Sequence, residues 1–215
     1  APFGAGVLLD GVIEAIAGAG IADVAAVGDP AVGKRLPRDV RLIPAAPSGV
    51  TNVARALDAW PGDDLLFATS DLPFVTAADL RAFLAASSGY DVTMALATAA
   101  AYEAAYPGAP PHVTALAGER VSGGSVFFIG RRARAPLGAV AGRFFEARKS
   151  AFAMARLLGA PLLLRYLLRR LRVDDVERRA RATLGVRAAA VRDAAPGLTY
   201  DVDTLADYRY ACARR

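Results

Sequence analysis

Three aspartates lie where acidic side chains can hold a cation. Asp71 follows the apolar run from Leu65 to Ala68, which we predict to be a buried strand, and Pro73 stiffens the turn after it. In open parallel sheets, ligands collect at the carboxyl ends of the strands. Magnesium takes one or two carboxylates together with phosphate oxygens, so Asp71 is suited to fix Mg²⁺ against a triphosphate. The alternative is that Ser70 and Asp71 only cap the following turn.

Asp201 and Asp203 form a second acidic pair near the end of the sequence. Alternate residues of an extended segment point to the same side, so both carboxylates can face one ion. Asp203 followed by Thr204 also has the pattern that starts a helix, and this is the purely structural alternative for the pair.

The chain around these aspartates alternates between short apolar runs and amphipathic stretches. We predict strands over residues 24–27, 40–43, 65–68, 92–96, 113–116, 126–129 and 186–191. Helices are expected over residues 7–19, 49–60 and 77–86, throughout residues 131–184, and after Thr204. A glycine-rich turn is expected at residues 122–125.

Near-continuous apolar strands that alternate with helices are typical of the α/β class, with a mostly parallel, Rossmann-like sheet and helices on both faces. We expect one domain over residues 1–215, with residues 131–184 as a helical excursion before the last strand.

The composition limits the class of protein. With 215 residues, 54% of them hydrophobic and 22% charged, the chain can bury a sizeable core. Charges interrupt every apolar stretch before the roughly 18 residues that a membrane helix needs, so we expect no membrane span. The single cysteine, Cys212, and the single histidine, His112, exclude an internal disulfide and a zinc site built from Cys and His ligands. A reducing, cytoplasmic location is therefore expected, and His112 is interpreted as structural or exposed.

The net charge of +5 comes from arginines that concentrate between Arg131 and Arg192. The regional positive charge predicts an anionic ligand or surface. Because the arginines lie on amphipathic helices and are not interleaved with exposed aromatics, we expect no nucleic-acid partner. The basic, amphipathic stretch 162–172 fits a helix packed over a sheet edge, with a membrane surface or a partner helix as the alternative. The sequence leaves the oligomeric state open.

Two segments together resemble the MobA-like nucleotidyltransferases: residues 65–76, which include Asp71-Leu72-Pro73, and residues 201–208, which include Asp201-Val202-Asp203. That family includes the molybdenum-cofactor guanylyl- and cytidylyltransferases and relatives that act on sugar and alditol phosphates. The resemblance covers nearly the whole chain. The start of the chain, Phe3-Gly4-Ala5-Gly6, looks like the family's entry to its first helix.

Two further segments carry the resemblance in the second half of the chain. Ser122-Gly123-Gly124-Ser125 looks like the family's acceptor-side turn, and Arg148-Lys149-Ser150 looks like the basic helix entry of one branch.

The resemblance implies a nucleotide-diphospho-sugar-transferase-like fold and a nucleotidyltransferase. The expected substrates are a nucleoside triphosphate and a small phosphorylated acceptor, and the expected product besides the nucleotide adduct is pyrophosphate. Asp71 would be the catalytic, metal-binding aspartate, and Asp203 or Asp201 would be the second ligand of Mg²⁺. Lys149 or Arg148 would stabilise charge on the attacking phosphate, with a solvated helix face as the alternative.

Contacts to the nucleotide or the acceptor are expected from several further residues. Asn52 follows Pro47-Ser48-Gly49 and can touch the nucleotide, although an Asn at a helix start often serves as a cap. The complete set of expected binding residues is Gly4, Asn52, Ser122, Gly123, Gly124, Ser125 and Arg148.

The family's usual beginning is a strand followed by Leu-Ala-Ala-Gly-x-Ser-x-Arg-Met-Gly, whose backbone cradles the triphosphate. The sequence starts at the segment after this loop, so we expect about twenty residues to precede it in the natural protein. Two other interpretations remain open. One is a degenerate, non-catalytic nucleotide-binding or scaffold protein, and the other is a glycosyltransferase that uses an acidic pair to hold a nucleotide sugar.

Overall fold

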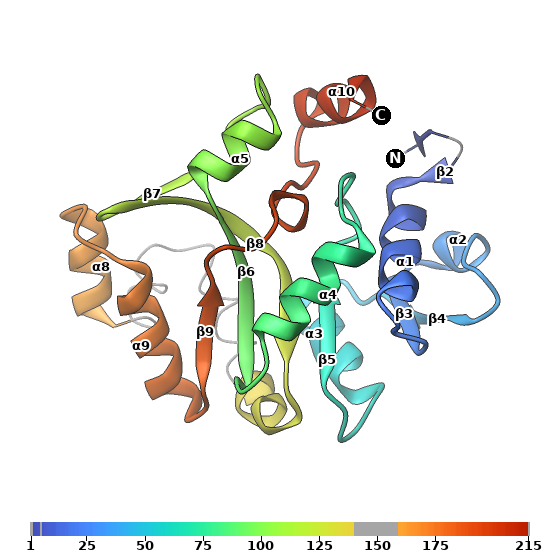
Figure 1. The fold of residues 1–215 in the computed structure, drawn as a ribbon. Coiled ribbons are helices and arrows are strands. Elements are labelled where there is room, and N and C mark those ends of the chain that lie inside the picture. The colour runs from blue at the N-terminus through green and yellow to red at the C-terminus, as the bar shows by residue number, and fades with distance from the viewer. Residues whose placement is uncertain (1, 5, 140–158, 215) are drawn as a thin grey trace.

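The computed structural model describes residues 2–4, 6–139 and 159–214 (Figure 1). The chain begins with two short strands, alternates between helices and strands, and ends with a helix. The strands are β1 (Pro2–Phe3), β2 (Gly6–Val7), β3 (Val24–Gly28), β4 (Val40–Pro44), β5 (Leu65–Ala68), β6 (Val92–Thr98), β7 (Thr114–Leu116), β8 (Glu119–Ile129) and β9 (Ala188–Val191). The helices are α1 (Leu8–Gly18), α2 (Pro30–Gly33), α3 (Gly49–Asp58), α4 (Ala77–Ala86), α5 (Ala99–Ala105), α8 (Ala160–Leu167), α9 (Val173–Leu184) and α10 (Leu205–Ala213), with short 3-10 turns at Arg131–Ala133 and Pro196–Leu198.

The central sheet has five strands in the order β5-β8-β6-β9, with β7 paired to β8. β8 runs antiparallel to β5, β6 and β7, and β9 runs parallel to β6. Strands β5, β6, β7 and β9 therefore point in one direction, and β8 is the reversed strand. The predicted α/β class is confirmed. Most strands of the central sheet run in the same direction, as predicted, but β8 is antiparallel to its neighbours, so the sheet is mixed.

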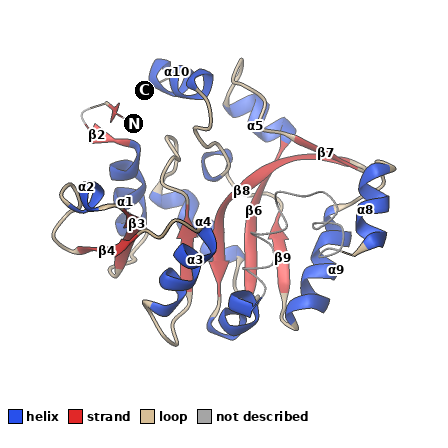
Figure 2. Cartoon of the chain, turned by 180° about the vertical axis from the view of Figure 1, so that it is seen from behind, coloured by secondary structure: helices blue, strands red, loops and turns tan. Residues whose placement is uncertain are grey.

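Helices cover both faces of this sheet (Figures 1 and 2). Leu80 and Phe83 of α4 pack with Leu66 of β5, whereas Leu57 of α3 packs with Leu65. Successive residues of a strand point to opposite faces, so α4 and α3 lie on opposite sides of β5.

A second, two-stranded sheet pairs β3 with β4 in parallel, and β1 pairs with β2 in a short antiparallel hairpin. Helix α1 joins the second sheet to the central one. Its Ile13 packs with Val24 and Val40, while its Val12 belongs to the same buried core as Leu80.

Local sequence signals explain the boundaries of α4. The Thr76 hydroxyl accepts a hydrogen bond from the backbone N–H of Asp79 at 3.2 Å, as expected for an N-cap. At the other end, the Ser87 hydroxyl donates to the Phe83 carbonyl at 2.8 Å. Capping at both ends and two buried apolar residues on one side make this the helix that the sequence predicts most accurately.

The structure corrects three predictions of local structure. Residues 122–125 are not a turn but the middle of β8, and the turn lies at Gly118, whose φ is +87°. Strand β5 was expected to be buried, but it stands at the end of the strand order and is only half-buried. Helix α5, capped by Thr98, was not predicted.

The helical excursion is present where the structure describes it, as the turn at Arg131–Ala133, α8 and α9. Residues 140–158 of the predicted excursion lie outside the described residues. In the part of the chain that is described, no helix is long and apolar enough to cross a membrane.

Candidate functional site

The end of β5 and the C-terminal acidic pair meet at one edge of the central sheet. The backbone N–H of Val202 donates to the carbonyl oxygen of Asp71 at 3.1 Å. Asp201 and Asp203 flank Val202, so this hydrogen bond brings three aspartates from two distant segments into one neighbourhood. The edge is the one at which β5 and β6 end, where ligands of open α/β sheets gather.

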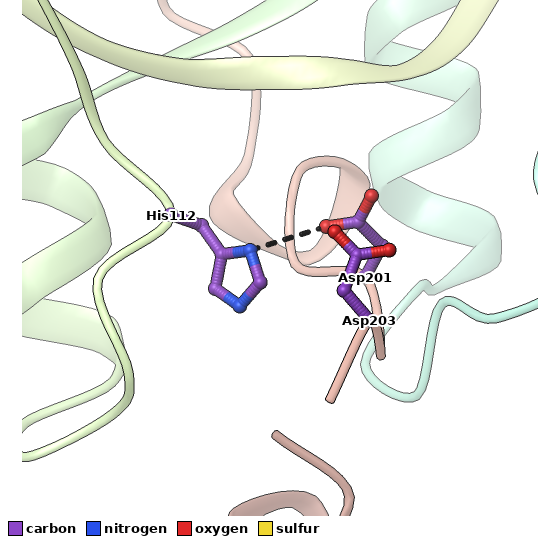
Figure 3. A group of neighbouring side chains, drawn as sticks. All are labelled: His112, Asp201 and Asp203. Atoms are coloured by element: carbon purple, nitrogen blue, oxygen red, sulfur yellow. Dashed lines mark ion pairs between the residues drawn. The ribbon is translucent and has the colours of Figure 1, made fainter. Parts of the chain in front are cut away.

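His112 faces this acidic pair (Figure 3). Its Nδ1 lies 3.4 Å from Oδ1 of Asp201, and one ligand atom from each of His112, Asp201 and Asp203 lies within 4.8 Å of the others. The His112 side chain is 14% exposed and that of Asp201 is 28% exposed, while Asp203 is open to solvent. The three side chains form a half-buried group of one imidazole and two carboxylates, which we call the His112 cluster.

Asp207 holds the other side of the imidazole. His112 Nε2 and Asp207 Oδ1 are 2.8 Å apart, and the Asp207 side chain is only 1% exposed. Its second oxygen accepts hydrogen bonds from the backbone N–H and the hydroxyl of Thr204, each at 2.7 Å. Burial raises the pKa of the Asp207 carboxyl, but the hydrogen bonds from Thr204 and His112 outweigh it and hold the pKa below its usual value. Asp207 is therefore ionised, and Nε2 is the donor.

The same contacts start helix α10. Thr204 is its N-cap, Asp207 is the third helical residue, and the two form a reciprocal capping box. The helix start and the orientation of His112 consequently depend on the same carboxylate. The sequence predicted a helix start at Asp203-Thr204. Thr204 is the N-cap in the structure, so Asp203 is not used as the cap and belongs to the His112 cluster.

A buried tyrosine fixes the imidazole from one side. Tyr200 is fully buried, and its hydroxyl donates to the carbonyl oxygen of Asp207 at 3.1 Å. Its ring centroid lies 5.4 Å from that of His112 and 5.9 Å from the stacked ring of Tyr102. Burial is the main cause that raises the pKa of both phenols, so they stay neutral.

Serine side chains of β8 hold the acidic segment against the sheet. The Ser125 hydroxyl donates to Oδ2 of Asp201 at 3.2 Å, and the Ser122 hydroxyl donates to the Thr199 carbonyl at 3.3 Å. The Ser125 carbonyl in turn accepts from the backbone N–H of Thr69 at 2.9 Å. Ser125 therefore links the end of β5 to Asp201.

Electrostatics at this edge favour a bound cation. Burial, followed by the negative charges of Asp203 and Asp71, raises the pKa of Asp201 despite the opposing effect of His112. Asp71 Oδ1 and Thr69 Oγ1 are buried and have no hydrogen-bond partner among the described residues. Such a buried carboxylate oxygen is costly unless it is paired or coordinates a metal. The residues present therefore fit a divalent cation held by oxygen ligands.

A cavity of about 760 Å³ opens beside this edge. Leu72 and Pro73, which directly follow Asp71, form part of its wall, and the first turns of α1 form another part. Acidic and basic side chains both line it: Asp10, Glu14, Arg35 and Arg214. The members of the His112 cluster do not line this cavity, so the acidic edge and the cavity are neighbouring features connected by the loop after β5.

Comparison with known families identifies the chain. The sequence pattern of the MobA-like NTP transferase domain matches residues 1–191. The chain belongs to this family. The MobA-like domain is a nucleotide-binding transferase in the general sense, and the matched range includes Asp71 and Ser122 to Ser125. Asp201, Asp203 and Asp207 lie beyond it.

Solved structures agree with this assignment. A hypothetical transferase from Thermus thermophilus is 28% identical, with a TM-score of 0.82 over 96% of this chain and 87% of that one. A CMP:2-keto-3-deoxy-manno-octonic acid synthetase complexed with CTP is 15% identical, with a TM-score of 0.59 over 100% of this chain and 89% of that one.

Rv0371c from Mycobacterium tuberculosis H37Rv, in complex with manganese, is 15% identical, with a TM-score of 0.53 over 99% of this chain and 89% of that one. The two likenesses at 15% identity show the fold alone, which is the predicted nucleotide-diphospho-sugar-transferase-like one. No curated protein matches the chain.

The structure places the remaining predicted site residues of this MobA-like domain in different surroundings. Asn52 uses both ends of its amide on Ala46, because its Oδ1 accepts from the Ala46 N–H at 2.6 Å and its Nδ2 donates to the Ala46 carbonyl at 3.2 Å. Gly4, with a φ of +60°, forms the bend between β1 and β2. Arg148 and Lys149 lie outside the described residues.

The two glycines of β8 differ in their surroundings. A Cβ at Gly123 would stand 2.4 Å from the Ala95 carbonyl oxygen, so glycine is required there for the close approach of β6. Gly124 has open space around it but a φ of +109°, which favours glycine. The backbone structure therefore explains why glycine occupies both positions.

His112 is the residue of the site that sequence analysis did not select. It lies 95 residues from its partner Asp207, and no local spacing relates the two. The signal available in the sequence was its uniqueness, since the chain has a single histidine.

Proposed function

We propose that this MobA-like domain transfers a nucleoside monophosphate from a nucleoside triphosphate to a small phosphorylated acceptor and releases pyrophosphate. The hydrogen bond between Val202 and Asp71 is the observation that carries the proposal, because it joins the end of β5 to the C-terminal acidic pair. Membership in the family supports the reaction class.

In this reaction, a phosphate oxygen of the acceptor attacks the α-phosphorus of the nucleoside triphosphate. A bond forms between that oxygen and the α-phosphorus, and the bond from the α-phosphorus to the oxygen that bridges to the β-phosphorus breaks. The electron pair of the broken bond leaves with pyrophosphate. Reactions of this type depend on alignment and charge neutralisation more than on a protein nucleophile.

Asp71, Asp203 and Asp201 would hold the divalent cation, predicted to be Mg²⁺. When bound, such an ion neutralises charge on the phosphate oxygens and orients the triphosphate. Asp71 contributes a buried oxygen without a hydrogen-bond partner among the described residues, and Ser125 orients Asp201 through its hydroxyl. Gly4 and the segment from Ser122 to Ser125 remain predicted contacts to the substrates, as do Arg148 and Lys149.

Calorimetric titration of each nucleoside triphosphate, with and without MgCl₂, tests the proposal. Wild-type protein should bind at least one triphosphate only when Mg²⁺ is present, and Asp71→Asn should weaken that binding by about tenfold or more, which is about 1.4 kcal/mol. The matched control is Asp58→Asn, which removes an exposed carboxylate at the end of α3, before β5 begins. Equal affinity in wild type and Asp71→Asn, or binding that ignores Mg²⁺, would contradict the proposal.

The product separates nucleotidyl transfer from glycosyl transfer. Release of pyrophosphate from a nucleoside triphosphate in the presence of phosphorylated acceptors is expected. Release of a nucleoside diphosphate from a nucleotide sugar would instead favour the glycosyltransferase alternative. We further propose that residues 1–215 act as one domain, which the core shared by Val12 and Leu80 supports, and that the protein works in the cytoplasm.

A further inference from the structure

We infer that His112 is a nitrogen ligand of the cation site, so that the site binds a first-row transition-metal ion such as Mn²⁺ or Co²⁺ more tightly than Mg²⁺. The inference rests on the proposed function for the existence of a cation at this edge. It adds a nitrogen ligand, which makes the preference for transition metals stronger than in a site made only of aspartates.

The hydrogen bonds of the imidazole leave one nitrogen available. Nε2 lies 2.8 Å from Oδ1 of the buried Asp207, so Nδ1 is the ring nitrogen that is left to bind an ion. Nδ1 points toward Asp201 (Figure 3) and lies 3.4 Å from its Oδ1. Nδ1 and the carboxylate oxygen of Asp201 thus face each other across a half-buried gap, and both are metal-binding atoms.

The dimensions of the His112 cluster suit a single ion. Metal bonds to imidazole nitrogen and carboxylate oxygen are about 2.0 to 2.4 Å long, so ligands of one ion lie at most about 4 to 5 Å apart. One ligand atom from each of His112, Asp201 and Asp203 falls within 4.8 Å of the others. One nitrogen and two oxygens can therefore reach the same ion with small side-chain movements.

Asp207 has the position of an outer partner of a metal-binding histidine. Such histidines usually donate their second N–H to a carboxylate, which fixes the tautomer and the ring orientation. Asp207 is 1% exposed and makes two further hydrogen bonds to Thr204, so it cannot turn away from the ring. The packing of Tyr200 at 5.4 Å between ring centroids restricts the ring from another side.

A second observation concerns the neighbouring segment after β5. Asp71 Oδ1 and Thr69 Oγ1 are buried without a hydrogen-bond partner among the described residues. The backbone N–H of Val202, between Asp201 and Asp203, donates to the carbonyl oxygen of Asp71 at 3.1 Å, so the two segments lie side by side. The His112 cluster therefore adjoins polar atoms that still need a partner.

The ligand types determine which metals are preferred. Mg²⁺ is a hard ion that favours oxygen ligands and releases its waters reluctantly. Imidazole nitrogen suits first-row transition metals, whose affinities for such ligands rise from Mn²⁺ to Co²⁺. Replacing one oxygen ligand by Nδ1 of His112 therefore favours the transition-metal ions over Mg²⁺.

Because the chain has a single histidine, spectroscopy can identify the ligand without ambiguity. Untagged full-length protein is loaded with MnCl₂, and pulsed EPR measures the coupling of Mn²⁺ to directly bound ¹⁴N. The wild type should show the imidazole nitrogen coupling, and His112→Gln should lose it. Bound Mn²⁺ without nitrogen coupling in the wild type would overturn the inference.

Calorimetry with MgCl₂, MnCl₂ and CoCl₂ measures the preference. His112→Gln should lower the affinity for Mn²⁺ and Co²⁺ by about tenfold or more, the loss that even outer-shell changes commonly cause, and should change the Mg²⁺ affinity much less. An equal loss for all three ions would mean that His112 acts only through the structure, and would overturn the inference. Circular dichroism of His112→Gln and His112→Asn checks that the variants fold, and the variant that folds is used.

The failure of this inference and that of the proposed function give different results. Triphosphate binding that requires Mg²⁺ and Asp71, together with Mn²⁺ that lacks nitrogen coupling, would preserve the proposed function and refute the role of His112. Nitrogen-coupled Mn²⁺ in a protein that neither binds triphosphate nor releases pyrophosphate would support the role of His112 and refute the proposed function.

Discussion

The variant Asp201→Asn should stabilise the cation-free protein and weaken its response to divalent cations. The asparagine keeps an oxygen that can accept the Ser125 hydrogen bond and removes one negative charge. Because the surroundings raise the pKa of Asp201, its ionised form lowers the stability of the folded state. The folded state is therefore most favoured while Asp201 is protonated, below the pKa that an aspartate has in the unfolded chain, about 4. This advantage is lost as the pH rises through the higher pKa of Asp201 in the folded protein.

The distance within the His112 cluster sets the size of the effect. Two like charges no more than 4.8 Å apart repel by roughly 1 kcal/mol in a water-like medium, which is appropriate because Asp203 is exposed. For a chain of this length, about 1 kcal/mol corresponds to roughly 2–4 °C in Tm. At pH 7.5 and without cations, Asp201→Asn should therefore melt about 2–4 °C above the wild type, and the difference should vanish as the pH falls toward about 4.

Divalent cations should largely cancel this difference in stability between the variant and the wild type. A cation at 100 times its Kd stabilises the wild type by about 2.7 kcal/mol, or roughly 5–11 °C in Tm. If the variant binds about tenfold more weakly, the same concentration stabilises it by only about 1.4 kcal/mol, or roughly 3–6 °C. Scanning calorimetry at pH 7.5 with and without MgCl₂ or MnCl₂ measures both effects, and Asp58→Asn should respond as the wild type does. An Asp201→Asn protein that is less stable without cations, or that keeps the full cation response, would refute the electrostatic argument.

Two further predictions concern stability. Leu80→Ala removes a fully buried side chain from the core between α4 and the sheet and should lower the free energy of unfolding by about 2–5 kcal/mol, measured by urea denaturation. A much smaller loss would mean that the core there is loosely packed. The hydrogen bonds from the Arg187 side chain and backbone outweigh burial and hold the pKa of Asp91 below its usual value. Arg187→Gln should therefore lower the stability at neutral pH, and the difference from wild type should disappear as the pH falls below about 4 and through the folded pKa of Asp91. A difference that persists in acid would show that the ion pair is not its cause.

Periodicity and capping predict the elements that depend on local interactions. Helix α4 spans the predicted residues 77–86 and begins after its N-cap, Thr76, and β3 to β6 contain the predicted strand residues. The pairing of the strands depends on contacts between distant segments. The sequence Ser122-Gly123-Gly124-Ser125 has the composition of a turn, yet it lies in β8 because Gly123 lets β6 approach closely. Local propensity was overridden there by tertiary pairing.

In the candidate site, too, some residues could be predicted from local sequence, whereas the contacts of others depend on the tertiary structure. Asp71, Asp201 and Asp203 were selected from their positions after an apolar run and in an extended segment, since a carboxylate at a strand end has an evident chemistry. Asn52 was also selected, but its amide is used on the neighbouring loop at Ala46. An isolated asparagine carries no sign of which backbone group it will meet.

Residue order alone determines the α/β alternation, the caps of α4 and α10, the family, and the acidic side chains available to a cation. Only the folded chain decides that Val202 bonds to Asp71, and that His112 turns one nitrogen to Asp207 and the other to Asp201. Caps and amphipathic helices arise between residues a few positions apart, so their pattern can be read along the sequence. The partners of His112 lie far away along the chain, and they are set by the packing of α10 and Tyr200 with Tyr102 of α5.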